Sequence, residues 1–293
     1  MKNKDDEFYT YYEDIAAELI HYIPHFVGKT IFLNCNDADE DKSGFWDYLV
    51  DNFNVFQLKE IIATSYNMDG NACVKRYDGN NIIKTALNGT GSFYSEESLS
   101  LLDEADLVIT NPPFSLFRDL VTLLISKDKK FLLVGNENTF ASTEMFPLIK
   151  DQKVWTGFNK IKKFKRKEEE DREFGNVCWF TNLSNDKQNE ELTLTKSYVP
   201  DNYPYYDNYY TAINVDAIAD IPKDYDGIMG IPISYLGKYN PKQFEILGLA
   251  AGNSKANKLF YDVPHKDSNL ERGGCGVVNG VRKYSRVFVK RIK

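Results

Sequence analysis

Apolar and polar residues follow helical and strand periods in turn along the first part of the chain. Between residues 12 and 23 apolar side chains recur every three or four positions, which predicts an amphipathic helix. Residues 30–33 form a short apolar run that is typical of a buried strand. A second helical stripe follows Ser43, a suitable N-cap, and a second strand is predicted over residues 58–64.

The pattern weakens over residues 65–93, which are rich in Asn, Gly and Asp and contain one predicted strand near residues 82–87. It is clearest after them. The elements predicted next are a helix over 96–104, a strand over 106–110, a turn over 111–114, a helix with an apolar stripe at Phe117, Leu120, Val121 and Leu124, and strands over 131–134 and 175–182. Alternating strands and helices predict an α/β fold with a mostly parallel central sheet, covered on both faces.

Two polar segments directly follow predicted strands of this sheet. Residues 34–37 follow the first strand, and residues 111–114 follow the strand over 106–110. Ligands of open α/β sheets bind outside the carboxyl ends of the strands. We therefore expect both segments to lie at the functional edge of the sheet.

The composition changes after residue 185. Residues 185–191 read as a polar linker, and residues 198–210 are dense in Tyr, Pro, Asp and Asn. A last strand is predicted near residues 285–289. We predict a first domain over residues 1–185 and a smaller α+β region over residues 186–293.

The overall composition favours a cytoplasmic protein. The first seven residues are mostly polar or charged, and no apolar run approaches the roughly 20 residues that span a bilayer. The four cysteines are far apart and form no C-x-x-C pair, and the three histidines do not cluster. We therefore predict no metal site and no disulfide framework.

The net charge of -7 is unusual for a protein that binds nucleic acid, because such proteins usually carry a basic footprint. The charge is unevenly placed, however. Residues 160–167 form a basic run, and the last dozen residues carry cations and no acid. Such patches can contact phosphates locally, although an exposed charged loop and a solvated tail would look the same.

Asn111, Pro112, Pro113 and Phe114 carry the candidate chemistry. The lone pair of an aromatic amine is delocalised into its ring, so a site that methylates it must accept the amino hydrogens and direct the lone pair at the methyl donor. The Asn111 side-chain oxygen and the Pro112 carbonyl suit this role, since the prolines restrict the backbone that positions them. Phe114 offers a ring for a base turned out of a duplex. A turn that starts a helix would use similar residues, but the flanking strand and amphipathic helix favour the amine site.

Residues 106–118 resemble the amino-methyltransferase signature in the form carried by the EcoRI-type adenine-specific DNA methyltransferase family. Further segments agree with that family in the same order, at residues 6–10, 32–37, 135–138, 205–209, 224–232 and 239–246. The resemblance covers nearly the whole chain, which makes it far more specific than the four-residue motif.

The resemblance implies a Rossmann-like methyltransferase fold with a smaller C-terminal α+β target-recognition region, and S-adenosylmethionine as the cofactor. The implied cofactor contacts are Phe8, Tyr9 and Thr10 over the methionine end, Asn34, Asn36 and Asp37 in the first cofactor loop, and Ser92 and Phe93 in a later loop. The family tends to place acidic residues in that later loop, where Thr90 and Ser92 are neutral in this chain. This departure bears on how tightly the cofactor is held.

The same resemblance implies transfer of a methyl group to the exocyclic N6 amino group of a flipped adenine in double-stranded DNA. The implied role is restriction-modification or phage protection, with a monomer acting on DNA and a restriction endonuclease as genetic partner. The predicted nucleic-acid contacts are Lys160, Lys162, Lys163, Lys165, Arg166, Tyr206 and Asn208. Two alternatives stay open: a catalytically weak or inactive nucleic-acid-binding member of the fold, and a methyltransferase acting on RNA or on a protein amide.

Overall fold

The computed structural model describes residues 8–35, 38, 44–166, 170–252 and 274–292, and the chain divides into two compact units. The first unit comprises residues 1–137 and 156–185, and the second comprises residues 138–155 and 186–293. Residues 138–155, which we expected in the first domain, thus group with the second unit. The functions assigned to the two predicted domains stay predictions.

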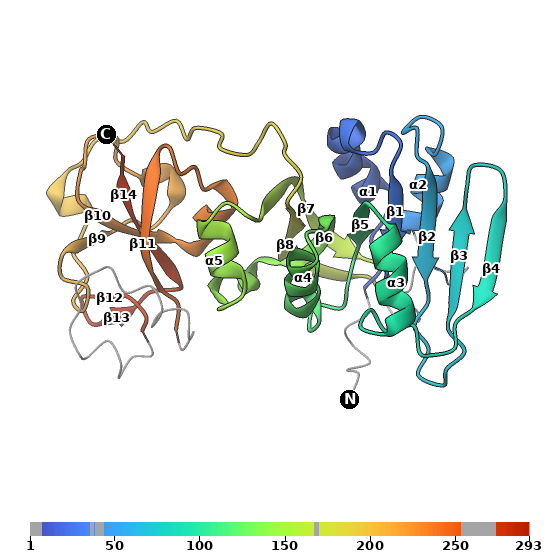
Figure 1. Ribbon diagram of the computed structural model, residues 1–293. Coiled ribbons are helices and arrows are strands. Elements are labelled where there is room, and N and C mark those ends of the chain that lie inside the picture. The colour runs from blue at the N-terminus through green and yellow to red at the C-terminus, as the bar shows by residue number, and fades with distance from the viewer. Residues whose placement is uncertain (1–7, 36–37, 39–43, 167–169, 253–273, 293) are drawn as a thin grey trace. The chain divides into compact units, whose positions relative to one another are not determined.

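An eight-stranded sheet forms the framework of the first unit, with the strand order β4-β3-β2-β1-β5-β6-β8-β7 (Figure 1). The bounds are β1 Thr30–Leu33, β2 Glu60–Thr64, β3 Cys73–Tyr77, β4 Ile82–Ala86, β5 Leu107–Thr110, β6 Lys130–Asn136, β7 Trp155–Phe164 and β8 Arg172–Thr181. The central strands β2, β1, β5 and β6 run parallel, while β3, β4 and β8 pair in antiparallel fashion at the flanks. The predicted α/β class with a parallel centre is confirmed.

Helices cover both faces of this sheet, with α1 and α2 on one face and α3 and α4 on the other (Figure 1). Their bounds are α1 Tyr12–Leu19, the 3-10 helix η1 Ile20–His25, α2 Gly44–Asp51, α3 Glu96–Glu104 and α4 Phe117–Ser126. Ile31 and Leu33 of β1 join α1 and α2 in one buried cluster. Successive strand residues point to opposite faces, and on the other face Phe117 packs on Phe180 with 5.0 Å between ring centroids. Strands covered on both faces are buried throughout and mainly apolar, as β1 and β5 are.

The strand order reverses between β1 and β5. From β1 the chain passes through α2 to β2 on one side, and it later passes through α3 to β5 on the other side. Open α/β sheets carry their ligand crevice at this point, outside the carboxyl ends of the two strands. Asn34 follows β1 and Asn111 follows β5, so the fold brings both predicted segments to the same edge.

Two strands of the eight-stranded sheet escaped prediction from the pattern. Strand β3 lies in the polar stretch and buries only Val74, because its partner β4 is an exposed strand at the edge of the sheet. Strand β7 contains the start of the basic run, where Ile161 and Phe164 are buried while the lysines between them are exposed. The alternative of a charged loop is therefore wrong for residues 160–164.

The second unit is built on a four-stranded sheet with the order β11-β14-β10-β9. Its elements are α5 Met145–Lys150, β9 Ala212–Asn214, β10 Ile228–Pro232, β11 Phe244–Ala250, β12 Val277–Val278, β13 Val281–Arg282, β14 Arg286–Arg291, and the 3-10 helices η3 Pro200–Asn202, η4 Ile218–Asp220 and η5 Ile233–Lys238. A further 3-10 helix, η2 Glu137–Ala141, spans the division between the units. Tyr206, Tyr209 and Phe288 pack together in a small core beside the sheet.

A buried carboxylate joins α1 to β7 in the first unit. Glu18 is 0% exposed and accepts hydrogen bonds from the backbone N–H groups of Phe158 and Asn159, each at 2.8 Å, and from the Tyr22 hydroxyl at 3.1 Å. Burial raises the pKa of Glu18, while these donors oppose the shift. Gly157 permits the close approach, since a Cβ there would lie 2.0 Å from Oε1 of Glu18.

We expect Glu18→Ala to lower the free energy of unfolding by about 3 kcal/mol, because it leaves two buried N–H groups without an acceptor. Urea denaturation followed by tryptophan fluorescence measures the change. Glu13→Ala is the matched control, since Glu13 lies exposed on the same helix, and it should change the stability by less than about 0.5 kcal/mol. Equal effects of the two substitutions would show that Glu18 does not secure β7.

Candidate active site

The side-chain amide of Asn111 is held by the N-terminal segment. Its Nδ2 donates to the carbonyl oxygen of Phe8 at 2.6 Å and to Oγ1 of Thr10 at 3.1 Å. A carbonyl oxygen only accepts, so the contact with Phe8 decides which end of the amide carries the nitrogen. Within the described part of the chain, Oδ1 of Asn111 accepts no hydrogen bond. The end of β5 therefore presents an oriented acceptor.

A second acceptor follows directly in the chain. This acceptor is not the carbonyl oxygen of Pro113, which already accepts a hydrogen bond from the N–H of Leu116 at 2.9 Å. The carbonyl oxygen of Pro112 accepts no hydrogen bond from the residues that the structure describes. Among the described residues, nothing donates a hydrogen bond to the side-chain oxygen of Asn111 or to the carbonyl oxygen of Pro112, so two consecutive residues carry acceptors without a partner.

The N-terminal segment is itself fixed to the end of β7. Tyr9 and Lys165 exchange backbone hydrogen bonds of 3.0 and 2.9 Å as an isolated β-bridge. The hydroxyl of Tyr11 donates to Asp171, and Nζ of Lys165 lies 4.7 Å from the centre of the Tyr11 ring. Thr10 is 5% exposed in this arrangement. The segment predicted to lie over the cofactor is therefore held against the motif at residues 111–114.

Phe114 lies in a cluster of aromatic rings. It stacks on Phe8 with 5.6 Å between centroids, and it meets Phe164 and Phe174 edge-on at 6.2 and 5.6 Å. The guanidinium of Arg172 lies over Phe8 and Phe174 at 5.5 and 5.2 Å. Phe114 stays partly exposed, so a base can reach only the part of its ring that the cluster leaves open.

Asn34 lies at the carboxyl end of β1 and is 4% exposed. Its side-chain oxygen is 3.6 Å from Sγ of Cys35, and its side-chain nitrogen has no hydrogen-bond partner among the residues described. Such a buried amide fits a ligand that brings its own acceptor. Asn36 and Asp37, the other predicted residues of this loop, lie outside the described residues.

The loop with Ser92 and Phe93 packs at the same edge of the sheet, beside the end of β2. Gly91 has φ +70°, and a Cβ there would lie 2.0 Å from the carbonyl oxygen of Ser65, which directly follows β2. The carboxylate of Glu97 accepts the backbone N–H groups of Asn88 and Gly89 at 3.0 and 3.2 Å and so holds the start of the loop. Ser92 is partly buried and Phe93 is 8% exposed.

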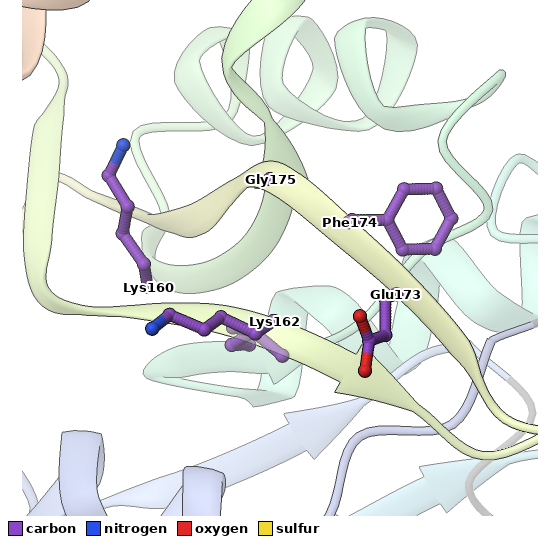
Figure 2. Close-up of a pocket in the computed structure, with 6 residues that line it drawn as sticks. Lys160, Lys162, Glu173, Phe174 and Gly175 are labelled. Carbon is purple, nitrogen blue, oxygen red and sulfur yellow. The ribbon is translucent and has the colours of Figure 1, made fainter.

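The predicted basic contacts lie on and after β7. Lys160 pairs with Glu137 at 2.8 Å and Lys163 with Asp171 at 2.8 Å, so the charge of these two lysines is balanced locally. Lys162 forms no ion pair within the described ranges. Lys160 and Lys162 line a half-open pocket of about 270 Å³ together with Phe174 of the aromatic cluster (Figure 2). Lys165 contacts Tyr11, as above, and Arg166 follows it in the chain.

The structure places Tyr206 and Asn208 away from any surface that could read DNA. Tyr206 is 1% exposed, and its hydroxyl donates to Oδ1 of Asn214 at 2.7 Å. Asn208 is 3% exposed, and its amide donates to the carbonyl of Cys275 at 2.7 Å and accepts the N–H of Val277 at 3.0 Å. The prediction that these two side chains contact bases is therefore wrong for this structure, because their polar atoms serve the interior of the second unit.

Sequence reasoning missed the residues that complete the aromatic cluster. Phe164 and Phe174 lie on the paired strands β7 and β8, and Arg172 begins β8. Ile161 and Phe164 are three positions apart in the basic run, so the sequence shows no period of two there and carried no signal that places Phe164 in the cluster.

A parallel sheet whose switch point adjoins an Asn-Pro-Pro-Phe turn is the arrangement expected of a Rossmann-like methyltransferase. The family model described as "Adenine-specific methyltransferase EcoRI" matches residues 1–81 and 74–292. The chain therefore belongs to this methyltransferase family.

Three relatives resemble the chain along almost its whole length. The type II methyltransferase M.MgeORF184P of Mycoplasma genitalium is 37% identical over 312 residues, covering 99% of this chain and 96% of that protein. M.MpnI of Mycoplasma pneumoniae is 36% identical, with coverage of 99% and 96%. M.EcoRI of Escherichia coli is 36% identical over 327 residues, with coverage of 99% and 94%.

No solved structure matches the chain significantly. None of the helices in the described ranges combines the length and the apolar content that crossing a membrane requires.

The packing of the loop around Gly91 can be tested by comparing two glycines with positive φ. Gly70→Ala should cost about 1 kcal/mol of unfolding free energy, because its φ of +81° is unfavourable for alanine but nothing lies within 4 Å. Gly91→Ala should cost at least about 2 kcal/mol more, since its Cβ would collide with the Ser65 backbone. Urea denaturation of both variants measures the difference. Equal losses would mean that the loop does not pack against the end of β2.

Proposed function

We propose that this methyltransferase transfers a methyl group from S-adenosylmethionine to the exocyclic N6 amino group of an adenine that is turned out of double-stranded DNA. The observation that supports this most directly is the oriented amide of Asn111. Its nitrogen is committed to Phe8 and Thr10, and its oxygen is left open beside the open carbonyl of Pro112.

These two oxygens suit an amine with two hydrogens. Each oxygen would accept one N–H of the adenine amino group, which draws the nitrogen toward tetrahedral geometry and frees its lone pair from the ring. Acceptors that are already in place act without reorganising during the reaction. No strong general base is required, because the methylated amine loses its extra proton readily to water. Catalysis is then mainly a matter of positioning.

The residues at the carboxyl edge fit the cofactor. Asn34 offers an unused buried amide nitrogen, Phe8 and Thr10 lie beside the motif, and Ser92 lies in the loop docked at the end of β2. When bound, S-adenosylmethionine supplies a methyl group on a positively charged sulfur, which is a good leaving group. Thr90 and Ser92 are hydroxyl residues, so any contact to the cofactor's adenine amino group at this loop would come from a neutral acceptor.

The DNA contacts that we retain are Lys160, Lys162, Lys163, Lys165 and Arg166. They lie on or directly after β7, and Lys160 and Lys162 share a pocket with Phe174 of the cluster that contains Phe114. Cations in this position can hold phosphates close to the extruded base. M.EcoRI and the two mycoplasmal relatives are type II methyltransferases, which supports a restriction-modification or phage-protection role, with a monomer acting on DNA and a restriction endonuclease as genetic partner.

The chemistry can be tested by transfer of tritiated methyl from S-adenosylmethionine to unmethylated plasmid DNA. We expect wild-type protein to label the DNA and Asn111→Ala to reduce the rate at least about 100-fold, as removal of a positioned hydrogen-bonding group does elsewhere. RNA and total protein serve as competing acceptors in parallel reactions. Label in either of these, and none in DNA, would contradict the proposed acceptor.

The role of the N-terminal segment calls for a separate pair of variants. Thr10→Val removes one of the two acceptors that orient the Asn111 amide, and we expect kcat to fall about 10-fold at saturating cofactor while the KM for DNA stays unchanged. Thr10→Ser keeps the hydroxyl and should restore most of the rate. If Thr10→Ser were as slow as Thr10→Val, the packing of the methyl group rather than the hydrogen bond would matter.

A second candidate function follows from the neutral loop at Thr90 and Ser92. A member of the fold that binds nucleic acid without turnover would not need a tight cofactor site. Titration calorimetry with S-adenosylmethionine separates the two functions, because turnover requires that the enzyme bind the cofactor. No heat up to millimolar cofactor would favour the binding protein.

A further inference from the structure

Side chains from a distant part of the sequence hold a small hairpin in the second unit. Strands β12 and β13 are joined by Asn279 and Gly280, whose φ angles of 49° and 75° are those of a tight hairpin turn. The carboxylate of Asp207 accepts both of their N–H groups, at 3.2 and 2.8 Å. The turn is therefore fixed by a side chain from a distant part of the sequence.

The strand that begins this hairpin is anchored as well. Asn208 binds the carbonyl of Cys275 and the N–H of Val277, and the hydroxyl of Tyr209 donates to the carbonyl of Gly274 at 2.9 Å. Cys275 and Val277 are buried. The tyrosine-rich segment, from which the sequence predicted DNA contacts, thus supports the hairpin.

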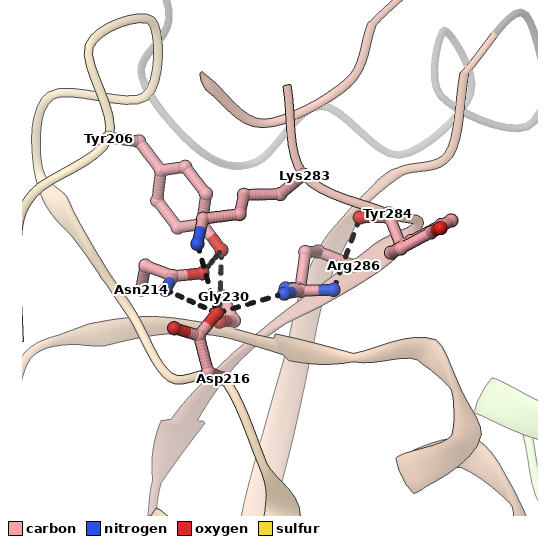
Figure 3. A network of polar contacts seen from close by, with 7 residues as sticks. All are labelled: Tyr206, Asn214, Asp216, Gly230, Lys283, Tyr284 and Arg286. Carbon is pink, nitrogen blue, oxygen red and sulfur yellow. Dashed lines mark hydrogen bonds and ion pairs between the residues drawn. The ribbon is translucent and has the colours of Figure 1, made fainter. Parts of the chain in front are cut away.

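The turn after the hairpin is clamped by Asp216 (Figure 3). Its carboxylate pairs with Nζ of Lys283 at 3.1 Å and with the guanidinium of Arg286 at 3.3 Å. Arg286 also donates to the carbonyl oxygen of Tyr284 at 3.3 Å. The donor amide of Asn214, together with Lys283 and Arg286, holds the pKa of Asp216 below its usual range, so the clamp stays charged at neutral pH.

This supported segment displays apolar side chains to solvent. Val281 is 64% exposed and Tyr284 is 90% exposed, with exposed Arg282 and partly buried Lys283 between them. Figure 3 shows the Tyr284 side chain turned away from Asp216. Residues 274–292 contain no acidic residue. Among the residues that the structure describes, Asp207 and Asp216 are the carboxylates that contact the segment, and both are engaged.

We propose that Val281, Arg282 and Tyr284 form a DNA-contacting surface of the second unit, on which Tyr284 stacks against a base and Arg282 contacts a phosphate. Base–aromatic stacking and apolar wedges between base steps use exposed aromatic and apolar side chains, and here the backbone that carries Tyr284 is fixed by the contact of its carbonyl with Arg286. A cationic, acid-free segment matches the charge of duplex DNA. This inference rests on the proposed function, since it names the surface through which that enzyme holds its DNA.

The test compares Tyr284→Ala with Tyr284→Phe and with Tyr205→Ala. Tyr205 is a matched control, because it is a tyrosine of the same unit, 51% exposed, that interacts with Tyr198 and Tyr225 instead of the hairpin. Binding is measured by fluorescence anisotropy of a labelled random-sequence duplex of about 30 base pairs, and turnover by the KM for unmethylated plasmid DNA. Affinity for S-adenosylmethionine is the control measurement, and it should stay unchanged in all three variants.

We expect Tyr284→Ala to raise the Kd and the KM for DNA about 10-fold, while Tyr284→Phe and Tyr205→Ala stay within about twofold of wild type. Arg282→Ala should reduce the dependence of log Kd on log salt by about one phosphate contact. If wild-type protein binds DNA and Tyr284→Ala and Arg282→Ala bind equally well, the hairpin surface is wrong and the proposed function stands. If wild-type protein binds no DNA, the proposed acceptor fails and the inference fails with it.

Discussion

The two hydrogen bonds from the Asn111 amide to Phe8 and Thr10 join the N-terminal segment to the end of β5, and the rest of the candidate site depends on them. They commit the amide nitrogen and leave the amide oxygen without a partner among the described residues, and they can form only if the N-terminal segment lies against the end of β5. That segment is held by the β-bridge of Tyr9 with Lys165 and by the contact of Tyr11 with Asp171. The chemistry of one side chain therefore depends on three separate parts of the first unit.

Both strand pairing and a buried side chain position the elements that make these contacts. Parallel pairing of β1 with β5 sets the end of one strand beside the end of the other, which a polar loop alone could not do. The buried carboxylate of Glu18 ties α1 to residues 158–159 in the middle of β7, the strand that leads directly to Lys165 and its bridge with Tyr9. The N-terminal helix, the basic strand and the catalytic turn thus form one connected body within the first unit.

The sequence predicted the parallel centre of the fold well, because β1, β5 and β6 are buried on both faces and read as continuous apolar runs. It predicted the flanks poorly, since β3 and β4 bury almost nothing and the lysines of β7 obscure its period of two. The catalytic motif could be proposed because it depends on local order. The orientation of the Asn111 amide could not be predicted, because it depends on contacts with residues more than a hundred positions away in the sequence. Tyr206 and Asn208 were misassigned for a related reason: polar side chains of a small core satisfy the backbone of a distant hairpin, and composition does not distinguish that use from contact with a base.

The central claim is that the open oxygens of Asn111 and Pro112 direct a methyl group to the amino nitrogen of adenine. Modification-sensitive sequencing of DNA from cells that express this protein tests it most directly, because it reports the modified base, the modified atom and the sequence context together. The account predicts N6-methyladenine at one recurring sequence, and its absence in cells that express Asn111→Ala. DNA that carries the mark at no site, or carries it on a cytosine, would contradict the account.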